Sequence, residues 1–153
     1  MRKFLPAYTL HVETTNLRCS EAYQEAFRTS EQVARLAREF LATDEREHFC
    51  VLFLDTKNRI KGAHEVGVGT LTACLVHPRE AFRLAVQIGA SAVIFFHNHP
   101  SGAPEPSRED TELTRRLYDA GKILGIRVLD HIIVADHGSR HYSFADAGEF
   151  PLG

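Results

Sequence analysis

A short apolar run that ends in two histidines constrains the fold of this 153-residue chain more than any other feature. Residues Ser91–Phe96 are almost all apolar, β-branched or aromatic, which is typical of a buried strand. Alternate residues of a strand point to the same face, so His97 and His99 project the same way from its end. The sequence therefore predicts a buried strand with two imidazoles at its C-terminal end.

An aspartate follows these histidines at the predicted start of the next helix. Asp110 stands eleven residues beyond His99, after the Gly- and Pro-containing stretch 101–106. Two neutral imidazoles and one carboxylate leave a fourth position open for water, as a catalytic zinc site requires. The spacing therefore predicts His97, His99 and Asp110 as ligands of one metal ion.

The residues at the predicted helix start also fit an interpretation without a metal ion. Ser107 and Asp110 form a helix-start signature, in which the serine caps the helix and the acid complements the free amides. An isolated His-x-His pair at a strand end is weak evidence for a metal. Capping and ligation are compatible, since a capped helix holds its first-turn carboxylate rigidly.

The remaining periodic segments predict the fold class. Helices are expected at residues 30–41, with Ser30 as its cap, at 78–89, where Pro78 opens the helix and Gly89 ends it, and at 107–124. Strands are expected at residues 8–13, 48–54, 59–68, 91–96, 126–135 and 141–144, and the second and third of these form a hairpin. Strands and helices mix without strict alternation, which predicts an α/β fold with a mixed β-sheet and flanking helices.

Composition narrows the class of protein. A hydrophobic fraction of 44% and a charged fraction of 25% are those of a soluble globular domain. The net charge of −2 gives no electrostatic argument for nucleic acid, and no apolar run is long enough for a membrane span. Three cysteines without a Cys-x-x-Cys pair suit a reducing cytoplasm. A nucleophilic Cys74 assisted by His77 is disfavoured, because residues three apart before a helix rarely meet productively.

The spacing His-x-His-Pro-x6-Ser-x2-Asp at residues 97–110 resembles the JAMM (MPN+) metalloprotease motif without a mismatch. The segment at the start of this motif, His97-Asn98-His99-Pro100-Ser101-Gly102, is similar to the RadC-like branch of that superfamily. Other segments share the likeness: Glu47-His48-Phe49, Leu52-Phe53-Leu54-Asp55, Gly69-Thr70, His77-Pro78-Arg79-Glu80 and Arg127-Val128-Leu129-Asp130-His131. The resemblance runs from about residue 44 to residue 148.

The resemblance implies an architecture. It implies a cytidine-deaminase-like JAB/MPN domain with a three-layer-like arrangement of sheet and helices. The domain would span residues 44–153, and residues 1–43 would be an N-terminal extension with one helix. The N-terminal part shows no Gly-hydrophobic-Gly hairpin, so the chain resembles a short form without the helix-hairpin-helix region of longer relatives.

The resemblance also implies a chemistry, with one Zn²⁺ per chain held by His97, His99 and Asp110. Glu65 would be the general base for a zinc-activated water, and the Ser107 hydroxyl would donate to the developing oxyanion. The bond would be a peptide or isopeptide bond in a protein or peptide substrate, such as one with a ubiquitin-like tail. From the residues alone, Glu65 reads as an exposed strand glutamate, and the neighbouring His64 faces the opposite side.

Alternatives stay open at this stage. The domain could be an inactive scaffold, or a DNA-repair or mobile-element-associated factor that processes nucleic acid. The contiguous His-Asn-His string differs from HNH endonucleases, and two imidazoles with one carboxylate suit zinc better than Mg²⁺. His131 is expected to be a core or interface histidine hydrogen-bonded to backbone, and Asp130 is a candidate hydrogen-bond partner of a ligand imidazole. The sequence leaves open whether the chain forms a homodimer.

Overall fold

The computed structural model describes residues 8–14, 26–41, 45–69, 76–135 and 140–150. Within them the elements are α1 (Ser30–Phe40), β1 (Glu47–Leu54), β2 (Ile60–Gly69), α2 (Pro78–Gln87), β3 (Ala92–His99), α3 (Arg108–Leu124), β4 (Arg127–Ala135) and β5 (His141–Ser143). The strands form one mixed sheet in the order β2-β1-β3-β4-β5, in which only β3 and β4 run parallel. The predicted α/β class with a mixed sheet and flanking helices is confirmed.

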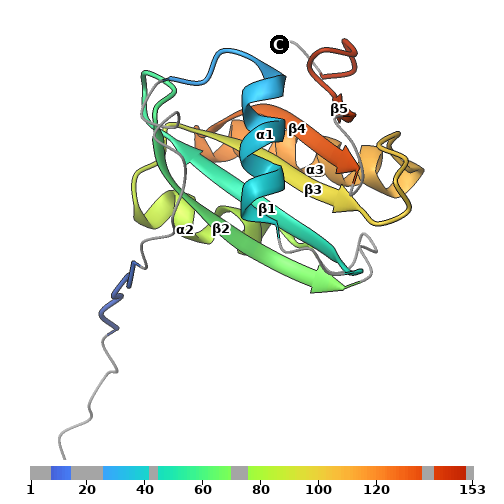
Figure 1. Ribbon diagram of the computed structural model, residues 1–153. Helices are drawn as coiled ribbons and strands as arrows, with labels where there is room; N and C mark the ends of the chain where they lie inside the picture. The colour runs from blue at the N-terminus through green and yellow to red at the C-terminus, as the bar shows by residue number, and fades with distance from the viewer. Residues whose placement is uncertain (1–7, 15–25, 42–44, 70–75, 136–139, 151–153) are drawn as a thin grey trace, which may run out of the picture.

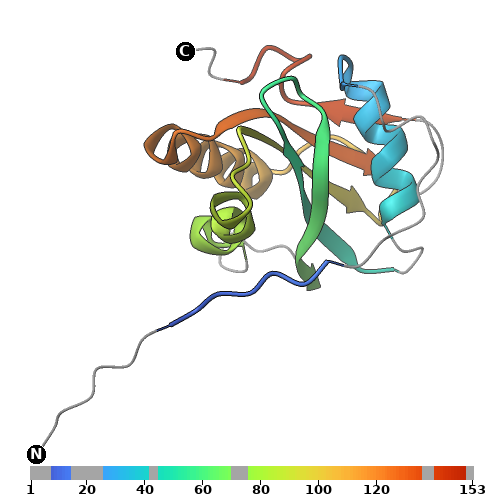
Figure 2. The same ribbon diagram turned by 90° about the vertical axis from the view of Figure 1, so that its left-hand side faces the viewer.

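Helices cover both faces of the sheet, which gives three layers (Figures 1 and 2). We call the side covered by α2 and α3 the α3 face, where Phe49, Val51 and Phe95 pack with Phe82 and Leu117. We call the other side the α1 face, and its packed side chains come from all three inner strands and from α1: Cys50, Leu52, Phe96, Ile132, Val33 and Leu36 among them. Successive residues of β1 and β3 therefore enter different cores, as strand geometry requires.

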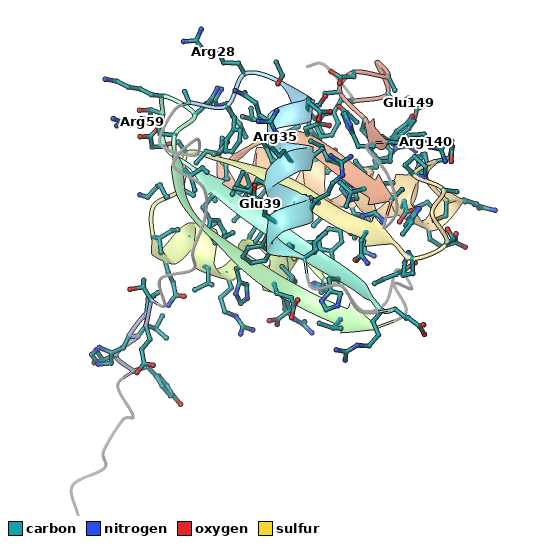
Figure 3. All side chains as sticks on the ribbon, viewed as in Figure 1. Arg28, Arg35, Glu39, Arg59, Arg140 and Glu149 are labelled. Atoms are coloured by element: carbon teal, nitrogen blue, oxygen red, sulfur yellow. The ribbon has the colours of Figure 1, made fainter. Side chains whose placement is uncertain are left out.

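Helix α1 is built from a strongly amphipathic stretch. Val33, Ala34, Leu36 and Ala37 are buried against the sheet, whereas Arg35 and Glu39 project outward (Figure 3). The expected cap was off by one residue, because Thr29 rather than Ser30 caps the helix through a capping box with Gln32. The Ser30 hydroxyl instead contacts His141 and Asp146, which joins α1 to the segment around β5.

The start of the chain differs from the expectation. Residues 8–14 form no strand, and Tyr8 and Leu10 are 88% and 76% exposed. Figure 2 shows this segment leading away from the sheet. A strand needs a hydrogen-bonding partner, and alternating apolar residues alone do not provide one. The boundary expected between residues 43 and 44 stays a prediction, although α1 packs in the same core as the strands.

The ends of α2 and α3 agree with the sequence signals. Pro78 is the first residue of α2, and His77 caps it by accepting the backbone N–H of Arg79. Gly89 follows the helix with a φ of 64°. Ser107 caps α3, and Gly125 ends it in the left-handed conformation. The cap at Ser107 fixes where the β3–α3 connection ends. Among the described residues, no helix is both long and apolar enough to cross a membrane.

Candidate metal centre

The structure brings His97, His99 and Asp110 together at one end of the sheet. His97 and His99 end β3, and Asp110 lies in the first turn of α3. One donor atom from each residue lies within 4.8 Å of the others. The two imidazole Nε2 atoms are 3.0 Å apart. The Asp110 carboxylate oxygens lie 3.2 Å from His97 Nε2 and 3.3 Å from His99 Nε2.

These separations fit a metal ion. Tetrahedral zinc with bonds of about 2.0–2.1 Å separates its donors by about 3.3 Å. Two bare imidazole nitrogens and a carboxylate that face one another at such distances repel unless a proton or cation lies between them. The residues present therefore match the donor set that a metal requires, and the cluster could hold a metal ion.

The backbone fixes the orientation of His99. Its Nδ1 lies 2.8 Å from the carbonyl oxygen of Ala103, and a carbonyl can only accept, so this nitrogen carries the proton. The Nε2 atom is then free to bind a cation. The loop that supplies this carbonyl is itself held by Arg140, whose Nη2 donates to Gly102 O at 3.2 Å. Figure 3 labels Arg140 near the β3–α3 connection.

Ser107 holds the third donor in place. The backbone N–H and the hydroxyl of Ser107 both donate to Asp110 Oδ2, at 2.7 and 2.8 Å, and the Asp110 N–H donates to the Ser107 hydroxyl at 3.1 Å. The predicted cap is thus present, and it orients the carboxylate toward the histidines. The hydroxyl proton of Ser107 points at Asp110, so its expected role as an oxyanion donor stays a prediction.

Burial and charge shift the pKa values of the three groups. Burial lowers the pKa of His97 and outweighs the opposing effect of Asp110. Burial also acts to lower the pKa of His99, but Asp110 and the Ala103 carbonyl outweigh it and raise that pKa. Burial would raise the pKa of Asp110, but its contacts with His97 and His99 hold it far below its usual range. An ionised carboxylate beside a neutral His97 is the state that a metal needs.

The structure does not bring Glu65 to this cluster. Glu65 pairs with Cys50 on β1, and Cys50 pairs with Phe96, so all three face α1. His97 follows Phe96 and faces the other way. The carboxylate of Glu65 instead lies 2.6 Å from Nδ1 of His48, a side chain that is 4% exposed.

A different glutamate faces the cluster. Glu47 precedes Phe49 by two residues, and Phe49 pairs with His97 and stacks on its ring at a centroid distance of 5.8 Å. The alternation of β1 therefore turns Glu47 toward the α3 face. Burial lowers the pKa of His97 on balance, and the negative charge of Glu47 is among the opposing effects that act to raise the pKa of His97 and of His99. Glu47 appeared in the sequence only within a family-like segment, and no local pattern distinguished it from other strand glutamates.

Asn98 links the histidine strand to the backbone on either side of Glu47. Its Oδ1 accepts the N–H of His48 at 2.7 Å, and its Nδ2 donates to the carbonyl of Arg46 at 2.9 Å. The Asn98 side chain is almost completely buried. One amide group therefore holds Glu47 in register with His97 and His99 from the opposite face of the sheet.

A second layer of polar groups lies behind His97. His131 on β4 is fully buried, and its Nε2 lies 2.8 Å from His97 Nδ1. It was expected as a core histidine bonded to backbone, and the partners of its ring are side chains instead. Burial, reinforced by the neighbouring His97, lowers its pKa well below the ordinary value. Asp130 does not contact a ligand imidazole; it accepts from Ser143 and from the backbone of Ala145. Cys74 lies outside the described residues.

A mixed five-stranded sheet with three helices and a His-His-Asp cluster at the end of its central strand defines a JAB/MPN-like domain. The chain belongs to the RadC-like JAB domain family, whose model matches residues 27–149. The match includes α1, which packs on the sheet.

Curated relatives agree with this assignment. The chain is 51% identical over 115 residues to a UPF0758 protein of Desulforudis audaxviator, an alignment that covers 75% of this chain and 50% of the relative. It is 51% identical over 124 residues to a UPF0758 protein of Trichlorobacter lovleyi, with 81% and 53% covered. A UPF0758 protein of Bacillus cereus is 46% identical over 117 residues, with 75% and 52% covered. The chain spans about half the length of these relatives.

Proposed function

We propose that this domain is a zinc-dependent hydrolase that cleaves a peptide or isopeptide bond, with Glu47 as its general base. The observation that carries the proposal is the donor set of His97, His99 and Asp110, spaced at 3.0–3.3 Å, with a carboxylate from β1 on the same face. Three protein donors leave a coordination position for water or substrate, which distinguishes catalytic from structural zinc sites.

Each residue would have a distinct task. A zinc ion held by these donors would supply the Lewis acid that polarises a carbonyl and lowers the pKa of water to about 7. Glu47 would accept a proton from the attacking water and return it to the leaving amine. Ser107 would donate to the developing oxyanion after its hydroxyl turns away from Asp110 Oδ2. The reaction needs no covalent intermediate, and no cysteine takes part.

The choice of Glu47 over Glu65 rests on the faces of the sheet. A general base must come within hydrogen-bond reach of the proton it removes. Glu65 would have to leave His48 and pass through the sheet to reach the cluster, because its strand partner Cys50 lies in the core on the α1 face. Glu65 as base remains the competing proposal, and matched variants separate the two.

A protein or peptide substrate, including one with a ubiquitin-like tail, is part of the same proposal. The test begins with metal analysis of the purified chain, followed by assays of peptide, isopeptide and nucleic acid substrates with Zn²⁺ present. We expect about one zinc per chain and cleavage of a peptide or isopeptide bond that E47Q abolishes. Zinc binding without any hydrolysis would favour a scaffold, and cleavage of nucleic acid alone would favour a DNA-processing role.

A further inference from the structure

A chain of hydrogen bonds runs behind His97 and ends on the helix that carries Asp110. His97 Nδ1 lies 2.8 Å from His131 Nε2, and His131 Nδ1 lies 2.6 Å from the hydroxyl oxygen of Thr114. The Thr114 hydroxyl donates to the backbone carbonyl of Asp110 at 2.6 Å. This series of hydrogen bonds therefore joins β3, β4 and α3. The side chains of His97, His131 and Thr114 that form it are all buried.

The protons of this chain can be assigned from the chemistry of its end. A carbonyl oxygen has no proton, so the single hydroxyl proton of Thr114 must lie toward Asp110. The Thr114 oxygen can then only accept from its other neighbour, so Nδ1 of His131 carries a proton.

The assignment continues to the metal ligand. The two ring nitrogens of His131 meet His97 and Thr114 rather than a carboxylate, and the ring lies among Phe49, Phe95 and Phe144. A charged imidazolium in such apolar surroundings is costly, so His131 is neutral. Its Nε2 is then an acceptor, and the proton of the 2.8 Å contact belongs to Nδ1 of His97.

We propose that His131 and Thr114 are positioning residues that fix the tautomer of His97 and present its Nε2 to the metal. This inference rests on the proposed metal site. A neutral imidazole with its proton on Nδ1 has a lone pair on Nε2, the atom that faces His99 and Asp110. Partners behind a ligand imidazole fix its tautomer and raise its basicity.

The Nδ1 protons of His97 and His99 are held by different kinds of acceptor. His99 needs one backbone carbonyl, that of Ala103, because it lies beside a loop. His97 lies inside the sheet, where its neighbours are side chains of β1 and β4. Its proton acceptor must therefore be a side chain, and His131 acts as one only while Thr114 holds a proton on the other nitrogen.

The first test measures tautomers without metal. Long-range ¹H–¹⁵N spectra of the metal-free full chain at about pH 8, above the ordinary histidine pKa of about 6.5, report which nitrogen carries the proton. We expect Nδ1–H for both His97 and His131 in the wild type and in T114S, which keeps the hydroxyl. In T114V neither tautomer of His131 has a hydrogen-bond partner at Nδ1. We therefore expect His97 and His131 each to become a mixture of the two tautomers. A proton on Nε2 of His97 in the wild type would overturn the proposal.

The second test measures Zn²⁺ affinity by competition with a chelator, and the visible spectrum of the Co²⁺-loaded protein. Loss of a partner behind a metal ligand weakens affinity by about 10–100-fold. We expect T114V to lose about tenfold and H131F more, while T114S stays within about twofold of the wild type. The Co²⁺ spectrum should change in T114V and not in T114S.

The outcomes separate this inference from the proposed function. If the wild type binds zinc and T114V, folded by circular dichroism, binds it equally well, the positioning role is overturned and the metal site stands. If the wild type binds no zinc, the proposed function fails. The tautomers of the wild type then test by themselves the assigned direction of the hydrogen bonds. A proton on Nδ1 of His97 supports that direction, and a proton on Nε2 overturns it.

Discussion

Glu47 and Glu65 stand on adjacent strands that are hydrogen-bonded to each other, yet their side chains belong to opposite faces of the sheet. Glu47 shares the α3 face with His97, whereas Glu65 shares the α1 face with His48 and Cys50. On the α3 face His97, His99 and Asp110 converge in a cluster that could hold a metal ion. On the α1 face an imidazole and a carboxylate satisfy each other at 2.6 Å.

The cause of this difference is one extra residue. Phe49 pairs with Gly67, and Cys50 pairs with Glu65, so Val66 is inserted as a β-bulge. Had the pairing continued without the bulge, Glu65 would lie opposite Val51 and on the α3 face. Strand periodicity thus assigns faces correctly only up to the first bulge, and a site glutamate cannot be chosen by alternation alone.

The largest expected effect is the loss of metal from the α3 face. The H97A/H99A double variant removes two of three donors, so we expect the bound zinc, about one per chain in the wild type, to be lost. The matched variant on the α1 face, H48Q, should retain it, because His48 contacts Glu65 rather than the cluster. Elemental analysis of both folded proteins measures this. Equal zinc in both variants would place the metal elsewhere.

The second expected effect concerns the two glutamates. Removal of a general base lowers kcat by about 10²–10⁴-fold, so E47Q should lose activity on this scale. E65Q should retain activity within a few-fold, since Glu65 pairs with His48 on the α1 face. Zinc content should be unchanged in both. Steady-state kinetics on a cleaved substrate measures the two. The reverse pattern, with E65Q inactive and E47Q active, would restore Glu65 as the base.

A third effect separates capping from catalysis. Ser107 caps α3 and Thr29 caps α1, each through a capping box. Loss of an N-cap costs about 1 kcal/mol, so S107A and T29A should lower the unfolding free energy of the metal-free protein similarly. If Ser107 also stabilises an oxyanion, S107A alone should lower kcat by about 10²-fold. Denaturant unfolding and kinetics test both parts, and an active S107A would leave the serine with its capping role alone.

The smallest expected effect is a pH dependence that arises from His99 on the α3 face. Burial acts to lower the pKa of His99, but Asp110 outweighs it and the pKa is raised. This pair stabilises the metal-free protein fully below the ordinary value of 6.5 and less as pH rises through the raised pKa. Metal binding requires the deprotonated ring, so zinc affinity should fall by up to about tenfold per pH unit below that pKa. Chelator competition at several pH values measures this slope, and a flat profile would contradict it.

Much of the fold followed from local patterns. The apolar run before His97 is a buried central strand, and α2 and α3 begin and end at residues that the capping signals indicate. The spacing of His97, His99 and Asp110 anticipated a cluster because strand alternation and helix starts are local properties. Residues 8–13 were wrongly expected to pair, because alternation says nothing of a partner.

The sequence by itself determined most of the elements and the three residues of the cluster, since strand alternation and helix capping depend on interactions within a few residues along the chain. Only the tertiary structure decided which other polar groups surround them. Glu47, Asn98, His131 and Thr114 reach the centre through strand pairing and helix packing between distant segments. Glu65 is turned away by a bulge whose position depends on the partner strand. Register is set between strands, so no pattern within a single strand reveals it.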